Sequence, residues 1–270
     1  MTDIKRNERK EDALKAFAEL IDIIDTLRSP DGCPWDRKQT SESLKPYIVE
    51  ETYEVLDAID SGDAAHIQEE LGDVLLQIML HSQIAYEEGT YHIGDVIRGL
   101  SRKMVERHPH VFASTKVNGA DEVVTNWEKI KADQKRERGL LDGIPPSLPG
   151  LLMAYRMGQK AGRVGFDWPD GAEVRAKVVE ELQELDDALS NGGRTELEHE
   201  LGDVLFAVAQ WGRHLGVDPE EAVRKCCMRF KRRFSYVEKS VKEAHRTFDE
   251  YSIDALEELW QQAKFDERNQ

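Results

Sequence analysis

The chain has 270 residues, a length that fits one large domain or two of ordinary size. Hydrophobic residues make up 40% of it, which is enough for a packed core and argues against general disorder. The net charge of −16 provides no general attraction to nucleic acid or to an anionic membrane, so we expect neither as a partner. No apolar run approaches the roughly 18 residues of a membrane span. Residues 1–10 lack the apolar block of a signal peptide, and the cysteines form no CxxC pair, so we expect a cytoplasmic protein.

Helical spacing of apolar residues runs along almost the whole chain. The first pattern begins near Leu14 and ends before the turn residues at 29–32. Further helical patterns cover about 41–60, 64–88, 94–107, 121–138, 151–163, 171–190, 194–215, 219–246 and 252–267. No alternating pattern of a β-strand interrupts them. The sequence therefore predicts an all-α fold.

The two halves of the chain repeat each other. Residues 49–75 align with residues 179–205 at a constant shift of 130, and 13 of the 27 positions are identical. Further on, Trp127 matches Trp260 at a shift of 133. Such a repeat indicates one helical module that is present twice.

A stretch rich in glycine and proline at 139–150 lies between the two copies. We therefore predict two tandem helical bundle domains, at 1–138 and 151–270, with residues 139–150 as the linker.

Each half carries two acidic pairs with a spacing of three on successive predicted helices. Their members are Glu51, Glu54, Glu70 and Asp73 in the first half, and Glu181, Glu184, Glu200 and Asp203 in the second. Residues three apart share a face of a helix, and a short turn makes the two helices antiparallel neighbours. Each carboxylate directly precedes a residue of an apolar stripe, such as Leu182 or Leu201. We therefore expect the carboxylates at the edges of stripes that face the core.

Four carboxylates at the margin of a core repel one another and lose hydration, and a divalent cation would offset both effects. Ligands that are all oxygen favour Mg²⁺, with Mn²⁺ as a substitute. The plain alternative is a solvated acidic face, because 53 of the 270 residues are acidic. A di-iron site would need two E-x-x-H motifs, and only Glu196-x-x-His199 is present. We predict a metal site in the second half and a second one in the first.

A metal site that handles phosphates also needs cations opposite the metal. Lys177 precedes Glu181 by one helical turn and should point at the same pocket. Arg229 and Arg233 are four residues apart, as are Trp260 and Lys264, so each pair shares a helix face. An indole beside a lysine could cover a base and reach a phosphate. Each pair alone also fits a solvated basic run or a core tryptophan.

Several longer motifs carry a family resemblance. They are Gly32-Cys33-Pro34-Trp35-Asp36, Glu50-Glu51-Thr52-Tyr53-Glu54-Val55, Glu70-Leu71-Gly72-Asp73, Arg107-His108-Pro109-His110-Val111-Phe112, Val164-Gly165-Phe166-Asp167-Trp168 and the second carboxylate set. With them, the sequence resembles the MazG family of nucleoside triphosphate pyrophosphohydrolases over nearly its whole length. The resemblance implies an all-α homodimer that depends on Mg²⁺ and cleaves (d)NTPs, ATP included, to the monophosphate and pyrophosphate, which clears nucleotide pools.

Functional roles follow from the resemblance position by position. It implies that Mg²⁺ is bound by Glu181, Glu184, Glu200 and Asp203, and the nucleotide by Lys177, Arg229, Arg233, Trp260 and Lys264. It places activity mainly in the second domain and makes the first structural or regulatory. Tyr47 occupies the position of Lys177 in the first half, so this half lacks one cation. It keeps all four carboxylates, Lys103, Arg107, Trp127 and Lys131, so its inactivity does not follow from its residues. The chain departs from the family at Cys227 and Arg229, where the family often has Asn and Lys.

The predicted reaction is attack of water on the α-phosphate, with the metal and the cations stabilising the developing charge. The catalytic candidates are Glu180, Glu181 and Glu184, and either Glu180 or Glu181 could take the proton of the water. The alternative from another class is a non-catalytic dimeric module that senses nucleotides or supports assembly.

Overall fold

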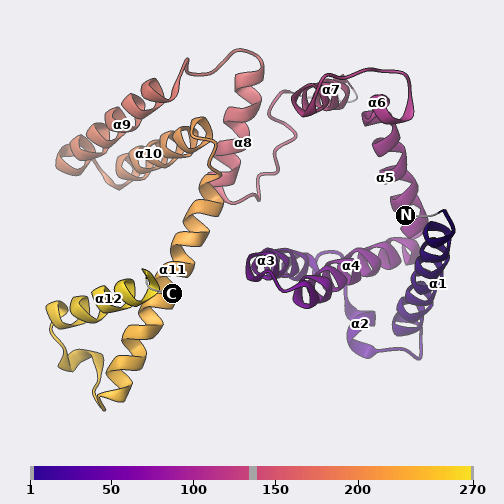
Figure 1. Cartoon of the computed structure of the whole chain (residues 1–270), viewed down its shortest axis with the longest axis horizontal. Coiled ribbons are helices and arrows are strands. Elements are labelled where there is room, and N and C mark those ends of the chain that lie inside the picture. The colour runs from indigo at the N-terminus through magenta and orange to yellow at the C-terminus, as the bar shows by residue number, and fades with distance from the viewer. Residues whose placement is uncertain (1–2, 134–138, 269–270) are drawn as a thin grey trace. The chain divides into compact units, whose positions relative to one another are not determined.

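The computed structural model describes residues 3–133 and 139–268 (Figure 1). Every regular element within these ranges is helical, so the all-α prediction is confirmed. The chain divides into two compact units, Met1–Lys135 and Arg136–Gln270. The domain and linker bounds drawn from the sequence stay a prediction. None of the helices in the described ranges has the length and apolar character needed to cross a bilayer.

The first unit is built from seven helices in the described ranges. They are α1 (Asp3–Arg28), α2 (Pro34–Lys38), α3 (Lys45–Ser61), α4 (Ala64–Glu87), α5 (Ile93–Arg107), α6 (Pro109–Phe112) and α7 (Ala120–Asp133). The sequence patterns miss the short helices α2 and α6. Both begin with a proline, whose fixed φ suits the first helical position. The last five residues of the pattern at 121–138 lie outside the described residues.

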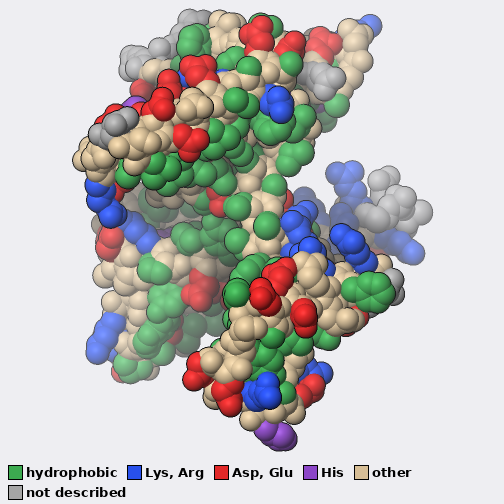
Figure 2. Space-filling view, turned by 90° about the vertical axis from the view of Figure 1, so that its left-hand side faces the viewer, with side chains coloured by type: hydrophobic (Ala, Val, Ile, Leu, Met, Phe, Trp, Pro, Cys, Tyr) green, Lys and Arg blue, Asp and Glu red, His purple; other side chains and the backbone are tan. Residues whose placement is uncertain are grey.

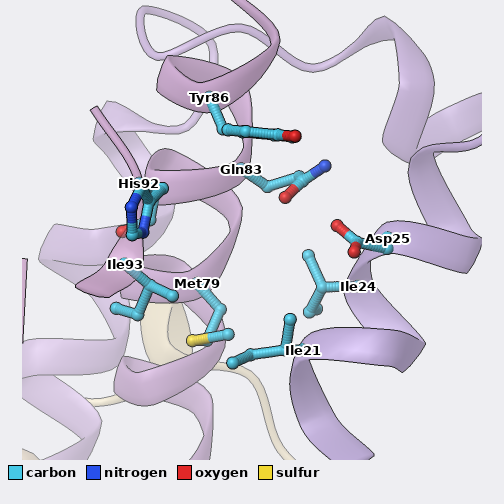
Figure 3. A pocket seen from close by; sticks show the side chains of 9 residues that line it. Ile21, Ile24, Asp25, Met79, Gln83, Tyr86, His92 and Ile93 are labelled. Carbon is cyan, nitrogen blue, oxygen red and sulfur yellow. The ribbon is translucent and has the colours of Figure 1, made fainter. Parts of the chain in front are cut away.

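The core of the first unit joins α1 to α4. Ile24 of α1 is buried in one cluster with Leu80 and Ile84 of α4. At the end of α1, Arg28 donates two hydrogen bonds to the carboxylate of Glu87. Beside this core lies a groove of about 310 Å³ whose lining includes Ile21 and Ile24, shown in Figure 3. None of the predicted site residues lines this groove.

The second unit repeats the helical hairpin of the first, and a long helix pair follows it. Its elements are α8 (Gly150–Arg163), α9 (Gly171–Asn191), α10 (Arg194–His214), α11 (Pro219–Glu243), the short 3₁₀ helix η1 (Phe248–Glu250) and α12 (Ile253–Arg268). The side chain of Asp170 caps α9 by accepting from the N–H groups of residues 172 and 173. Asp218 caps α11 in the same way. Helix α9 packs along α10, and α12 packs along α11 (Figure 1).

A chain of hydrogen bonds anchors the loop before α9 to α10. The fully buried Gln210 donates to the carbonyl oxygen of Ala154 over 2.7 Å and accepts from Arg213 Nε over 2.9 Å. Arg213 in turn donates to both carboxylate oxygens of Asp167. A Cβ at Gly158 would lie 1.7 Å from Gln210 Oε1, so glycine is required for this close approach. The hydrogen bonds from Arg213 hold the pKa of Asp167 at about 2.

Replacing Asp167 with asparagine should destabilise the second unit. Because the pKa of Asp167 is lowered on folding, its ionised form stabilises the fold above pH 4, and this contribution is lost as the pH falls toward 2. Allowing for partial solvent exposure, we expect a loss of about 1 to 2 kcal/mol at pH 7. The measurement is the urea midpoint of both proteins across this pH range. A difference between the two urea midpoints that stays constant down to pH 2 would contradict a stabilising role of the Asp167 charge.

The buried face of α9 overlaps the predicted one only in part. Glu181 itself is 6% exposed and lies in line with buried Val178, whereas Leu182 is 46% exposed. On α10, Leu201 is 49% exposed while Val204 is buried. The expectation that the stripes containing Leu182 and Leu201 face the core is therefore met only in part, because Val178 and Val204 of the same stripes are buried and the two leucines are not. The physical reason is that the apolar residues of both helices spread over a wide arc, and the hairpin covers only the part of it that holds Val178, Glu181 and Val204.

Candidate active site

The hairpin of α9 and α10 brings carboxylates from both helices together. One oxygen atom each of Glu181, Glu184 and Glu200 lies within 4.8 Å of the others. Asp203 joins them through Glu200, because His199, Glu200 and Asp203 form a second group with the same limit. We call the residues Glu181, Glu184, Glu200 and Asp203 the second-half cluster. The spacing of three on each helix produces this convergence, since it places each pair on one face.

Lys177 provides positive charge at the buried end of the second-half cluster. Its Nζ lies 2.7 Å from Glu181 and 2.8 Å from Glu180. The hydrogen bonds with Glu180 and Glu181 raise the pKa of Lys177, so the ammonium stays charged. The hydrogen bond with Glu181 raises the pKa of Glu184, and burial and the charges of Glu181 and Glu200 act in the same direction. The single positive charge of Lys177 therefore does not neutralise the four carboxylates of the cluster.

The hairpin of α3 and α4 repeats this arrangement in the first unit. Carboxylate oxygens of Glu51, Glu54 and Glu70 lie within 4.8 Å of one another. The pKa of Glu51 is raised, chiefly by burial. A hydrogen bond with Glu54 and the charges of Asp73, Glu54 and Glu70 raise it further. Tyr47 takes the place of Lys177 and contacts the ring of Trp35 instead. This cluster thus lacks the lysine that balances part of the charge in the second half.

Both clusters fit a hard divalent cation. Their oxygen ligands are the type that such cations prefer, and the raised pKa values of Glu51 and Glu184 fit carboxylates that are crowded by other carboxylates. In the first half, Glu70 Oε2 is buried and has no hydrogen-bond partner within the described ranges. A buried carboxylate oxygen is rarely left without a partner. The acidic clusters could therefore bind a metal.

The other four predicted nucleotide-binding residues lie on α11 and α12. Arg233 stands with its guanidinium carbon 5.8 Å from the centre of the Trp260 ring. Phe230 packs against the same ring, with 5.0 Å between ring centres. Arg229 is exposed on α11, and Lys264 is partly buried on α12. The structure therefore groups these cations with aromatic rings on one helix pair, whereas Lys177 lies on α9 with the carboxylates.

Two side chains at these places were not predicted to contact the site residues, although His199 was considered as part of an E-x-x-H motif. His199 Nδ1 lies 3.2 Å from Asp203 and 3.4 Å from Glu200, and these carboxylates raise its pKa. Its spacing of four from Asp203 could have placed it beside the cluster. Glu267 forms ion pairs with Arg232 and Arg233. No spacing rule links α11 with α12, so sequence patterns do not reveal this contact.

Comparison with known proteins places this geometry in a family. The family model of the MazG nucleotide pyrophosphohydrolase domain matches residues 39–112 and 171–237. The two matches span the two hairpins, and the prediction of two tandem MazG-type domains is confirmed.

Curated relatives match along most of the chain. The nucleoside triphosphate pyrophosphohydrolase/pyrophosphatase MazG of Thermotoga maritima is 45% identical over 92% of this chain and 95% of its own. The nucleoside triphosphate pyrophosphohydrolase of Escherichia coli K12 is 41% identical over 91% of this chain and 95% of its own. The crystal structure of a mazG-related protein from Thermotoga maritima is 27% identical, with a TM-score of 0.36 over 43% of this chain and 97% of its own. The resemblance read from the motifs is confirmed: the chain belongs to the MazG nucleotide pyrophosphohydrolase family.

Proposed function

We propose that the chain is a nucleoside triphosphate pyrophosphohydrolase that cleaves (d)NTPs to the monophosphate and pyrophosphate. The observation that carries the proposal is the second-half cluster, where three carboxylates from two helices meet beside Lys177. Relatives that bear the name of this activity cover most of the chain. Removal of stray nucleotides from the cellular pool is the role that such an activity would serve.

Mg²⁺ is the proposed cation, held by Glu181, Glu184, Glu200 and Asp203, with Mn²⁺ as a substitute. When bound, the cation would supply charge that binds the phosphates and polarises a water for attack at the α-phosphate. Glu181 and Glu180 are the candidates to take the proton of that water, and of the two only Glu181 lies within the cluster. Lys177 spans both carboxylates and holds them in place.

The proposed nucleotide contacts come from Lys177 on α9 and from residues of α11 and α12. Arg229, Arg233 and Lys264 carry positive charge suited to the triphosphate. Trp260 and Phe230 offer ring faces on which a base can stack, a contact that every base can make. Such a site would favour broad base tolerance.

A homodimer is part of the proposal. Leu182, Leu201 and Leu205 leave an apolar face of the α9–α10 hairpin open to solvent. Figure 2 shows hydrophobic side chains lying among acidic ones on the surface of the molecule. Two hairpins related by a twofold axis would bury these exposed leucines in a four-helix bundle. We define the apolar face by Leu182, Leu189, Leu201, Leu205 and Val208.

In the first half, we propose that Glu51, Glu54, Glu70 and Asp73 hold a second cation with a structural or regulatory role. The orphaned Glu70 Oε2 supports a ligand there. Tyr47 replaces the lysine that the second half has at position 177, so this half lacks one proposed phosphate contact. This difference argues against full catalysis in the first half.

The proposed function is tested by pyrophosphate release from a panel of NTPs and dNTPs, with and without Mg²⁺. We expect release from several nucleotides, with an equal yield of monophosphate, and loss of release when EDTA removes the cation. Release of orthophosphate instead would place the attack at the γ-phosphate and contradict the proposed cleavage. No release from any nucleotide would favour a module that binds nucleotides without hydrolysing them.

A further inference from the structure

Arg233 is held on two sides by residues of α12. Its Nε donates to Glu267 Oε2 over 2.8 Å, and its NH2 group lies 2.6 Å from the same oxygen. Its guanidinium also lies over the ring of Trp260. Arg232 reaches the other oxygen of Glu267, but it is 61% exposed, against 24% for Arg233. The sheltered pair in this network is therefore Arg233 with Glu267.

This arrangement restricts the guanidinium while leaving donors for another acceptor. Nε and NH2 face the carboxylate of Glu267 and one face of the group lies over the indole, so the NH1 side is the edge left for an anion. A free arginine loses rotamer freedom when it binds a phosphate. An arginine that is already fixed by an ion pair and a ring loses less.

We propose that Glu267 is a positioning residue, which holds Arg233 over Trp260 in readiness for the triphosphate. The inference rests on the proposed function, because it takes the nucleotide as the ligand of Arg233. Glu267 makes its ion pairs with the arginines and acts through them. The two arginines also hold the pKa of Glu267 below its usual range, so the carboxylate is charged whenever the site is used.

The first half offers a natural comparison. Arg107 lies over the ring of Trp127, with its guanidinium carbon 5.4 Å from the ring centre, as Arg233 lies over Trp260. The shift of 133 that aligns these tryptophans places Gln134, which lies outside the described residues, at the position of Glu267. The half proposed to lack full catalysis thus has an uncharged residue at this position. The substitution Glu267→Gln gives the second half the residue of the first.

The test compares wild type with Glu267→Gln, Arg233→Gln and the double variant. Asp266→Asn is the matched control, since it removes the same charge from the adjacent residue of α12, which pairs with Gln262 instead. The readouts are KM and kcat for pyrophosphate release, and calorimetric Kd for a non-hydrolysable triphosphate analogue with Mg²⁺. We expect Glu267→Gln to raise KM and Kd by about three- to tenfold and to change kcat by less than about twofold. Asp266→Asn should match wild type.

The double variant separates positioning from independent contacts. If Glu267 acts through Arg233, the double variant is no weaker than Arg233→Gln alone. If the fold-increases in KM of the two single variants multiply in the double variant, the two residues act independently and the inference is overturned. A KM lowered by Glu267→Gln would also overturn it, because Glu267 would then compete with the phosphates for Arg233. If Glu267→Gln fails to fold, Glu267→Asp keeps the charge with a shorter reach and should raise KM in the same direction.

The two proposals fail in different ways. An active wild type with an unchanged Glu267→Gln variant removes the positioning role and leaves the function intact. A wild type that binds the analogue but releases no pyrophosphate removes the function, and a raised Kd in Glu267→Gln would still support the positioning role.

Discussion

Replacing Glu184 with glutamine is expected to lower pyrophosphate release by about 100- to 1,000-fold. The carboxylate of Glu184 lies within 4.8 Å of Glu181 and Glu200, and its neighbours raise its pKa because the cluster holds excess negative charge. Glutamine keeps the shape but supplies a neutral oxygen, which weakens the grip on a divalent cation. The measurement is kcat/KM at the Mg²⁺ concentration that saturates the wild type. A partial rescue by higher Mg²⁺ or by Mn²⁺ would support a role as a metal ligand.

Two companion variants make this result specific. Asp187→Asn changes an exposed carboxylate one turn further along α9, which pairs only weakly with Gln183, and should leave activity unchanged. Glu54→Gln alters the matching carboxylate of the first half and should lower activity by less than about threefold if catalysis resides in the second half. Full activity in Glu184→Gln would rule out the proposed metal site. Equal losses in Glu54→Gln and Glu184→Gln would mean two working or coupled sites.

The helices and the two hairpins could be predicted from the sequence because their signals are local. The pattern at 171–190 matches α9 (Gly171–Asn191), and the pattern at 194–215 matches α10 (Arg194–His214) within a residue at each end. The spacing of three and the short turn between these helices also predict that their carboxylates converge. The same rules placed Lys177 beside Glu181. Each of these contacts lies within one helix or between helices joined by a short turn.

The burial of particular faces could not be predicted in the same way. Leu182 and Leu201 belong to regular apolar stripes, and a stripe shows only that a face will be buried, not which surface covers it. In α9 the hairpin buries Val178 and Glu181 but leaves Leu182 of the same stripe exposed. The leucine face is left for a second chain in the proposed dimer. Hydrophobic periodicity alone does not separate a core within a chain from an interface between chains.

Contacts between distant segments were also beyond sequence patterns. Glu267 and Arg233 are 34 residues apart and meet because α12 folds back along α11. The same holds for Arg213 and Asp167, which are 46 residues apart. Charged residues make up 33% of the chain, so each arginine has many acidic residues that could be its partner in sequence. Only the packing of the helices selects one.

Replacing Leu201 with aspartate is expected to dissociate the proposed dimer. We expect most of the pyrophosphate release to be lost at the same time. Leu201 is 49% exposed on the apolar face of the hairpin, beside the cluster residue Glu200. A twofold interface would bury this position twice, so the substitution removes two leucines and introduces two unpaired charges. The dimer dissociation constant should rise at least about 1,000-fold. The measurements are the molar mass by light scattering after gel filtration and the rate of pyrophosphate release at the same protein concentrations.

The matched control is Gln183→Glu, which adds one negative charge to an exposed position next to Leu182 that is not part of the apolar face. It should remain dimeric and active, because its neighbourhood is already polar. A Leu201→Asp variant that is monomeric yet fully active would show that one chain holds the complete site and that catalysis does not require the dimer. A dimeric and active Leu201→Asp variant would contradict the proposed interface itself. Loss of dimer and activity together, at an unchanged helix content by circular dichroism and with Gln183→Glu still active, would support a site that the second copy completes, because the control shows that an added charge beside the cluster residue Glu184 is tolerated.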